Sequence, residues 1–308
     1  MQNRSETFLA YVILAIAPLF FSTNVVFGRA AQDIEPFTLA ALRWSLTAII
    51  LLAATRRHWP SMRETLRTNL LLLMTVGFLG MWICGGAVYL ALKYTTATNG
   101  TLIYTIPPVI IVVIEFLWRG RPIALREMAG ILLAFLGVLA IVLKGDPAAI
   151  FRLDFNPGDL VFVVAAISWA LYSVLLKSKS LAHLSTVPLL ALVACAGAAT
   201  LIPFAAAEIV LTGNFPSTAR QWWIISGIVV LASIISFSTF QYGVKVLGPS
   251  IAGIFLYLLP PCGIGLAWLF LGEQLLPFHF AGMAMILGGV IIATLPVAAL
   301  RRRARPPA

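Results

Sequence analysis

The sequence predicts an all-α membrane protein of ten transmembrane helices, arranged as two inverted five-helix repeats with both termini in the cytoplasm. The first observation is composition: 61% of the 308 residues are hydrophobic, only 10% are charged, and the mean hydropathy is +0.99. Soluble domains carry about 25% charged residues. The second observation is a motif that occurs twice, about half a chain apart, each time inside an apolar run.

Ten apolar segments are long enough to cross a bilayer, which takes about 20 mostly apolar residues per helix. They are residues 8–28, 37–54, 70–92, 97–118, 128–143, 159–177, 186–211, 222–244, 249–271 and 279–299. The first has a longer apolar core than a secretory signal, so we interpret it as a helix. The longest connections, residues 55–69 and 144–159, have the length of loops. One membrane domain is therefore expected.

Basic residues in the connecting segments predict the orientation, because loops that stay in the cytoplasm carry more of them. One side collects fifteen: Arg4, Arg56, Arg57, Arg63, Arg67, Arg119, Arg121, Arg126, Lys177, Lys179, Lys245, Arg301, Arg302, Arg303 and Arg305. The other side collects five: Arg29, Lys93, Lys144, Arg152 and Arg220. Both termini lie on the richer side, which predicts that both are cytoplasmic.

The repeated motif reads G-x-x-x-Y-x-x-P-P, at residues 100–108 and again at 253–261. Downstream, "AGILLAFLGV" from Ala129 resembles "AGMAMILGGV" from Ala281 at its ends. These matches predict one repeat over residues 1–148 and a related one over 149–308. Because five helices are an odd number, the second repeat must enter the membrane from the opposite side, as in many secondary transporters.

The motif prolines predict two broken helices. Pro107 and Pro108 lie near the middle of the fourth span, and Pro260 and Pro261 near the middle of the ninth. Proline has no N–H, and its ring clashes with the carbonyl four residues earlier. The carbonyls expected to lose their donors are those of Ile103, Tyr104, Leu256 and Tyr257. We predict that the breaks meet near the midplane and serve gating, with the two motif tyrosines flanking one cavity; packing kinks are the alternative.

Aromatic and neutral polar residues at mid-span positions are the candidates for substrate binding. They are Asn24, Trp82, Tyr89, Tyr104, Ser168, Trp169, Tyr172, Phe237 and Tyr257. Trp169 and Tyr172 are three residues apart and so share a helix face. The alternative for each is a role in packing, because aromatic side chains also fill the cores of helix bundles.

Charged residues in the spans are few. Arg43 lies about two turns from the outer end of the second span and is expected to snorkel or to pair with a carboxylate. Glu115 and Arg119 have the spacing of a helical ion pair. No acidic residue occupies the centre of a span, which argues against a glutamate that exchanges protons for cationic drugs. The scarcity of deep cations makes a sugar-phosphate carrier the lesser transport hypothesis.

Other functional classes find little support in the sequence. The net charge of +10 is spread over short gaps, so no nucleic-acid partner is predicted. The cysteines have no metal-binding spacing, and no metal or cofactor is predicted. The histidines lie in loops or at a helix end, and no H-E-x-x-H or S-x-x-K motif occurs, so a membrane-embedded enzyme is a remote alternative. The predicted partners are a small-molecule substrate and the lipid bilayer.

Several stretches carry a family resemblance: "AALRWSLTAIILL", "ISWALYSVLLK", "LALKYTTA" against "YGVKVLGPS", and "FLGEQLLPFHFAGMAMILGGVIIA". Over nearly its whole length the chain resembles the EamA-type permeases of the drug/metabolite transporter superfamily. The resemblance implies an inner-membrane exporter of amino acids, aromatic ones among them, or of related metabolites, working by alternating access around a central cavity. Arg43 and Glu273 match residues usual in the family, whereas Phe21 stands where many relatives carry tryptophan. Drugs or sugar phosphates are the alternative solutes.

Overall fold

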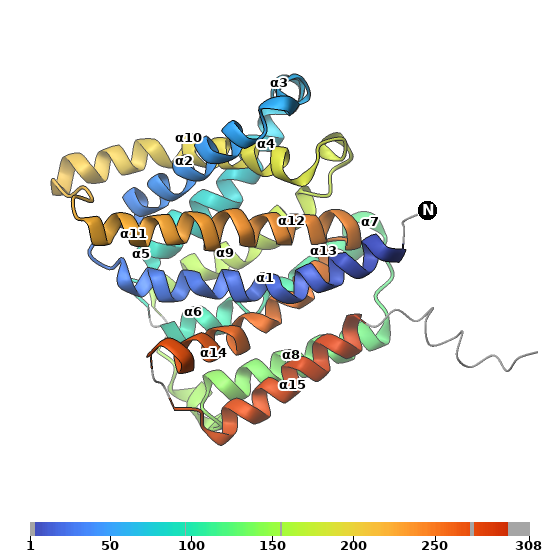
Figure 1. Ribbon diagram of the computed structural model, residues 1–308. Coiled ribbons are helices and arrows are strands. Elements are labelled where there is room, and N and C mark those ends of the chain that lie inside the picture. The colour runs from blue at the N-terminus through green and yellow to red at the C-terminus, as the bar shows by residue number, and fades with distance from the viewer. Residues whose placement is uncertain (1–3, 96, 155, 272–273, 295–308) are drawn as a thin grey trace, which may run out of the picture.

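The computed structural model describes residues 4–95, 97–154, 156–271 and 274–294, and these residues form helices and connecting turns (Figure 1). Ten helices in this part of the chain are long and apolar enough to cross a membrane. The first half contains α1 (Arg4–Ala30), α2 (Pro36–Ala54), α4 (Leu70–Gly77) continued by a π-helical stretch (Phe78–Ala87) and α5 (Val88–Ala91), α6 (Ala97–Ile103) with α7 (Pro107–Arg119), and α8 (Leu125–Val142). The second half contains α9 (Pro157–Leu175), α10 (Thr186–Thr212), α11 (Ala219–Gly227) continued by a π-helical stretch (Ile228–Ile235) and α12 (Ser236–Leu247), α13 (Pro249–Ile254) continued by a 3-10 turn (Phe255–Leu258) and α14 (Leu259–Leu271), and α15 (Pro277–Thr294).

These ten helices confirm the predicted spans, with differences at their ends. The eighth span was expected at residues 222–244 but covers Ala219–Leu247. It starts earlier because Thr218 and Gln221 form a capping box, in which each side chain binds the other's backbone N–H. The connection at residues 55–69 was expected to be a loop, yet it contains the short helix α3 (Trp59–Thr68), which buries Met62 and Thr65. Glu273, which the family resemblance singled out, lies outside the described residues.

The spanning helices form one bundle whose interior lies between two outer pairs (Figure 1). In this view α2 and α10 lie together at the top, α8 and α15 lie together at the bottom, and α1 with α12 runs between them. The largest apolar cluster draws buried side chains from both halves of the chain. The interior therefore depends on contacts between the halves rather than on a core within each.

Glycines set the closeness of α8 and α15. A Cβ atom added at Gly130 would lie 2.5 Å from the carbonyl oxygen of Gly289, and one added at Gly289 would lie 2.5 Å from that of Gly130. Gly137 and Gly282 show the same reciprocal approach, at 2.7 and 2.6 Å. Real Cβ atoms do not come so near to a backbone oxygen, so only glycine permits this contact. Small residues let membrane helices bring their backbones together in this way.

The proline motifs coincide with breaks in both helices. In the fourth span α6 ends at Ile103 and α7 begins at Pro107, and in the ninth a 3-10 turn precedes Pro260. The expectation of bare carbonyls is wrong for two of the four. The Ile106 N–H donates to the Ile103 carbonyl at 3.1 Å, and the N–H of residue 259 donates to the carbonyl of residue 256. At each break the helix thus changes locally to 3-10 hydrogen bonding, so that one of the two carbonyls expected to be bare accepts an N–H three residues later.

Buried carboxylates tie each end of the broken fourth span to a neighbouring helix. The predicted ion pair of Glu115 with Arg119 forms at 3.0 Å, and the other Glu115 oxygen accepts a 2.8 Å hydrogen bond from the Ser250 hydroxyl on α13. At the opposite end, Asn99 of α6 donates to the carboxylate of Asp159 on α9 at 3.0 Å. The segments on the two sides of the break are therefore anchored to different partners.

A carboxylate from α10 caps the start of α2. Glu208 accepts the backbone N–H groups of Phe37, at 3.1 Å, and Thr38, at 2.8 Å. We expect Glu208→Ala to lower the free energy of unfolding by about 1 kcal/mol, because it leaves free amides at a helix N-terminus. Thermal unfolding in detergent measures this. The control is Glu64→Ala, since Glu64 is exposed; equal midpoints for the two variants would contradict the capping role.

Candidate substrate site

Six aromatic rings from four helices meet inside the bundle, and we call them the central aromatic cluster. Its members are Phe21 of α1, Trp44 of α2, Trp169 and Tyr172 of α9, and Phe237 and Phe240 of α12. The Phe237 ring lies 4.8 Å from that of Trp44 and 5.6 Å from that of Trp169, both edge-on. Edge-to-face contacts at these separations are favourable beyond simple burial. The cluster joins the two halves of the chain.

The pair predicted on one face of the sixth span lies in this cluster. The Trp169 and Tyr172 rings are 5.2 Å apart, and both side chains are buried. The Tyr172 ring lies directly over Gly80 in the π-helical stretch of the third span, where an added Cβ would come within 2.6 Å of it. Gln241 donates a 2.9 Å hydrogen bond to the Tyr172 hydroxyl. The third, sixth and eighth spans therefore contribute to one region.

A group of polar residues, which we call the arginine cluster, borders the aromatic rings; it consists of Asn24, Arg43, Tyr89 and Ser233. Arg43 is 5% exposed. Its Nε donates to the Ser233 hydroxyl at 2.7 Å, and its Nη1 donates to Asn24 Oδ1 at 3.2 Å and to the Tyr89 hydroxyl at 3.0 Å. Nη2 donates to the Ala232 carbonyl at 2.7 Å.

The arginine cluster adjoins the aromatic cluster directly. The Arg43 guanidinium carbon lies 4.9 Å from the centre of the Trp44 ring and 5.9 Å from that of Phe237. These distances are within the range of a cation–π interaction. Arg43 also binds a π-helical stretch of the eighth span, a helix form that is frequent at functional sites. A charge, hydrogen-bonding groups and rings thus meet in one buried region.

Several buried polar atoms at the aromatic cluster have no hydrogen-bond partner among the residues that the structure describes. They are the indole N–H groups of Trp44 and Trp169 and the side-chain oxygen of Gln241. Buried polar groups in native proteins are nearly always paired, so each of these atoms needs an explanation. Two donors and one acceptor beside a ring cluster are suited to a small solute that carries both polar and apolar groups.

The remaining predicted site residues are distributed around this region. Trp82 belongs to a second ring group with Phe37, whose centre lies 5.4 Å away. Tyr104 packs on the Phe162 ring at 5.5 Å, in an apolar cluster apart from the one that contains Tyr257. Tyr257 is buried, and its hydroxyl has no partner in the described part of the chain. Ser168, which precedes Trp169, is also buried. The two motif tyrosines therefore lie in separate apolar clusters.

The two proline motifs contact each other. A Cβ added at Gly253, the first residue of the second motif, would lie 2.8 Å from the Ile111 side chain and 3.7 Å from the Pro108 Cα. The Ser22 hydroxyl of α1 donates to the carbonyl of Leu259 at 3.0 Å, just before the second proline pair. The break in the ninth span is thus held between the first and fourth spans.

Sequence reasoning did not predict five site residues of this region, and it missed the role of Arg43. The five are Phe21, Trp44, Ser233, Phe240 and Gln241. Arg43 was expected to snorkel or to pair with a carboxylate. Its side chain is instead buried, and its partners among the described residues are neutral groups on the first, third and eighth spans. The signal available was its position inside an apolar span, since a charge at that depth is by default a functional candidate. The partners themselves could not be read from the sequence.

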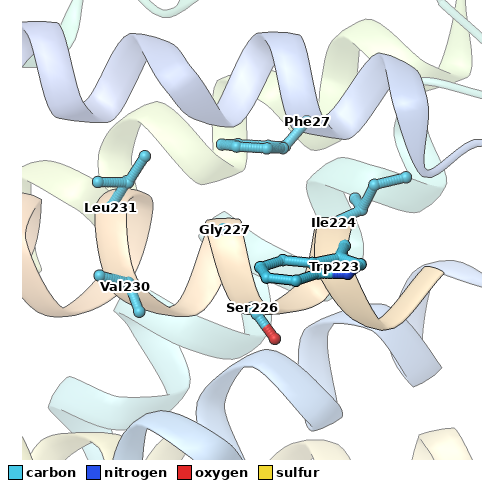
Figure 2. Close-up of a pocket in the computed structure, with 7 residues that line it drawn as sticks. All are labelled: Phe27, Trp223, Ile224, Ser226, Gly227, Val230 and Leu231. Atoms are coloured by element: carbon cyan, nitrogen blue, oxygen red, sulfur yellow. The ribbon is translucent and has the colours of Figure 1, made fainter. Parts of the chain in front are cut away.

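An apolar groove of about 450 Å³ lies elsewhere, between α1 and the start of the eighth span (Figure 2). Figure 2 shows Phe27 over Gly227, with Trp223 beside them. Ser226 supplies the one side-chain hydroxyl in its lining. Trp223 is 78% exposed on the outside of the bundle. With no charged group in its wall, this groove is a poorer candidate for a polar solute than the two buried clusters.

Comparison with known proteins places the chain among transporters. An uncharacterized transporter, YetK, of Bacillus subtilis is 25% identical over 93% of this chain and 87% of its own length. A probable amino-acid metabolite efflux pump of Escherichia coli is 24% identical over 94% and 95%. A probable terminal-alkyne amino-acid exporter of Streptantibioticus cattleyicolor is 27% identical over 70% and 69%. These relatives are named as transporters, and the chain is likewise not an enzyme.

Fold and sequence profile agree with this placement. A crystal structure of a protein with 21% identity covers 98% of this chain and 100% of its own, with a TM-score of 0.75, and so shares the fold. The profile described as the EamA-like transporter family matches residues 8–143 and 156–295, which is most of the chain. With ten apolar helices around a buried polar and aromatic region, this multi-pass membrane protein belongs to the EamA-like transporter family.

Proposed function

We propose that this transporter exports amino acids or related small metabolites across the inner membrane, by alternating access around the central aromatic cluster. The observation that carries the proposal is the meeting of Arg43, the unpaired indole N–H groups and the rings in one buried place. An amino acid offers the matching parts: a carboxylate for donors, an ammonium for an acceptor, and a side chain for the rings. Aromatic amino acids would fill the most ring surface.

The named relatives support this solute class. Several transporters similar to this chain carry names that refer to amino acids: the probable efflux pumps of Escherichia coli and Salmonella typhimurium and the probable exporter of Streptantibioticus cattleyicolor. Cationic drugs fit less well, because Arg43 would repel them. Sugar phosphates also fit less well, since Lys93 is bound to Glu35 at 2.8 Å and lies in an exposed position. We propose export rather than uptake because these relatives are named as an exporter and as efflux pumps.

We further propose two inverted five-helix repeats, at residues 1–148 and 149–308, with both termini in the cytoplasm. The contact of α8 with α15 supports a two-fold relation: Gly130 meets Gly289 and Gly137 meets Gly282. Each glycine pair joins the second position of one decapeptide to the ninth position of the other. Such reciprocal contacts are what a two-fold axis produces. π-helical stretches in both the third and the eighth spans agree with it.

Alternation would bend the fourth and ninth spans at the proline breaks. Pro107 and Pro108 separate α6 from α7, and the two segments are tied to different neighbours, through Asn99 at one end and Glu115 at the other. Movement of one segment therefore need not displace the other. In the ninth span, the counterparts are Pro260 and Pro261. The Gly253 contact with the first motif would couple the two breaks.

Counterflow in proteoliposomes tests the function. Vesicles that contain the purified protein and excess unlabelled phenylalanine should take up external labelled phenylalanine transiently above equilibrium, with saturable dependence on its concentration. Protein-free vesicles are the control. The same assay is repeated with each proteinogenic amino acid. Flux that never saturates would contradict a carrier, and no counterflow with any amino acid would refute the proposed solute class.

A further inference from the structure

Arg43 is a buried cation with no counter-ion among the residues that the structure describes. Its side chain makes four hydrogen bonds, and every acceptor is neutral: a serine hydroxyl, a tyrosine hydroxyl, an amide oxygen and a backbone carbonyl. The ion pairs among the described residues include other cations but not Arg43. A buried charge is costly unless an opposite charge compensates it. The described residues around Arg43 therefore leave its positive charge without a neutralising negative charge.

The Arg43 guanidinium is bound along its Nε–Nη2 edge, and one N–H remains for a ligand on its Nη1–Nη2 edge. Nε is bound to Ser233 and Nη2 to Ala232, both in the π-helical stretch of the eighth span. Guanidinium has five N–H donors, and the four bonds leave one N–H on Nη2 unused. The Nη1 bonds go to the side chains of Asn24 and Tyr89, which also bind each other at 2.8 Å. These two groups can remain paired if a ligand takes over Nη1.

The Nη1–Nη2 edge suits a carboxylate once the solute replaces the Nη1 contacts to Asn24 and Tyr89. Nη1 and Nη2 present parallel N–H groups, and a carboxylate accepts such a fork with two hydrogen bonds. The rings of Trp44 and Phe237 lie beside the guanidinium, so an apolar group attached to the carboxylate would enter the central aromatic cluster. The unpaired N–H of Trp44 adds a donor nearby. A cationic or uncharged head group would leave the charge of Arg43 uncompensated.

We propose that Arg43 binds the carboxylate of the transported solute and makes a carboxylate the feature that the site requires. This inference rests on the proposed function in one respect, namely that the bound carboxylate belongs to the transported solute. Carboxylate binding by Arg43 is tested without transport. The solute class is then narrowed to carboxylates that carry an apolar or aromatic group. When the solute binds, it would replace the hydrogen bonds of Arg43 to Asn24 and Tyr89. Solute binding would thereby release Arg43 from the first and third spans.

Direct binding to the purified protein tests the inference, with quenching of tryptophan fluorescence as the readout. The probes are phenylpropionate, which has the carboxylate and no amine, and phenethylamine, which has the amine and no carboxylate. Wild-type protein should bind phenylpropionate about tenfold or more tightly than phenethylamine, because a charge-assisted hydrogen bond is lost with the carboxylate. Equal affinities, or no binding of phenylpropionate, would overturn the proposal.

Variants assign the effect to the arginine. Arg43→Gln should lose the preference for phenylpropionate, and Arg43→Lys, which keeps the charge but not the fork, should retain part of it. Lys93→Gln is the control: it should keep the preference, because it removes a cation that is exposed and paired with Glu35 at 2.8 Å. Full preference in a folded Arg43→Gln protein would refute the inference. If that variant does not fold, the probe comparison on the wild type decides. Carboxylate-selective binding without counterflow would instead count against the proposed function alone.

Discussion

Alanine in place of Trp169 is expected to lower amino-acid counterflow by about tenfold or more, which corresponds to the loss of about 1.4 kcal/mol of binding or more. Trp169 contacts Phe21, Tyr172, Phe237 and Phe240, and none of the described residues accepts a hydrogen bond from its buried N–H. Its loss removes ring surface and a donor from the proposed site together. Counterflow in proteoliposomes, normalised to the reconstituted protein, measures the change.

Phenylalanine at the same position separates these two contributions. Trp169→Phe keeps a ring but removes the N–H, which has no hydrogen-bond partner among the described residues. A buried donor without a partner destabilises a fold, so its removal should offset part of the cost of the smaller ring. We therefore expect Trp169→Phe to unfold near the wild-type temperature and yet to transport more weakly.

An exposed tryptophan provides the control for both substitutions. Trp223 is 78% exposed on the outside of the bundle, against 7% for Trp169. Trp223→Ala and Trp223→Phe should leave counterflow near the wild-type rate. Wild-type transport by Trp169→Ala would remove the central aromatic cluster from the substrate path, and equal losses at both positions would indicate a general effect of tryptophan removal.

The sequence predicted the fold more completely than the site, for a physical reason. A span is a local property: about 20 apolar residues must be consecutive, and residues 37–54 were therefore found within one residue of α2. The helix α3 was missed because it is short and polar and lies between two spans. The π-helical stretches also left no readable pattern, since their residues are as apolar as those of the helices they interrupt.

The site depends on which helices are neighbours, and one sequence does not reveal this. Asn24 and Tyr89 were chosen singly, as polar residues in apolar spans, but their common partner Arg43 was expected to snorkel or to pair with a carboxylate. Trp169 and Tyr172 were paired correctly by their spacing on one helix. Trp44, from another helix, had no such relation to them. Contacts within a helix were predictable, whereas those between helices needed the structure.

Alanine at Gly130 or Gly289 is expected to destabilise the protein by about 1–3 kcal/mol, the usual cost of overpacking a close interface. The added methyl group would lie 2.5 Å from a backbone oxygen of the facing helix, and backbone cannot rotate away as a side chain can. The α8 and α15 helices must therefore separate. Thermal unfolding in detergent should show a lower midpoint for each variant.

The double variant and a control make this prediction specific to the interface. Because Gly130 and Gly289 share one contact, separation of the helices by the first substitution makes room for the second, and the double variant should lose less than the sum of the two single losses. Gly265→Ala is the matched control, since no atom lies within 4 Å of a Cβ built there. Additive losses would mean that the two glycines act independently. A loss at Gly265 equal to that at Gly130 would mean that backbone contact between α8 and α15 is not the cause.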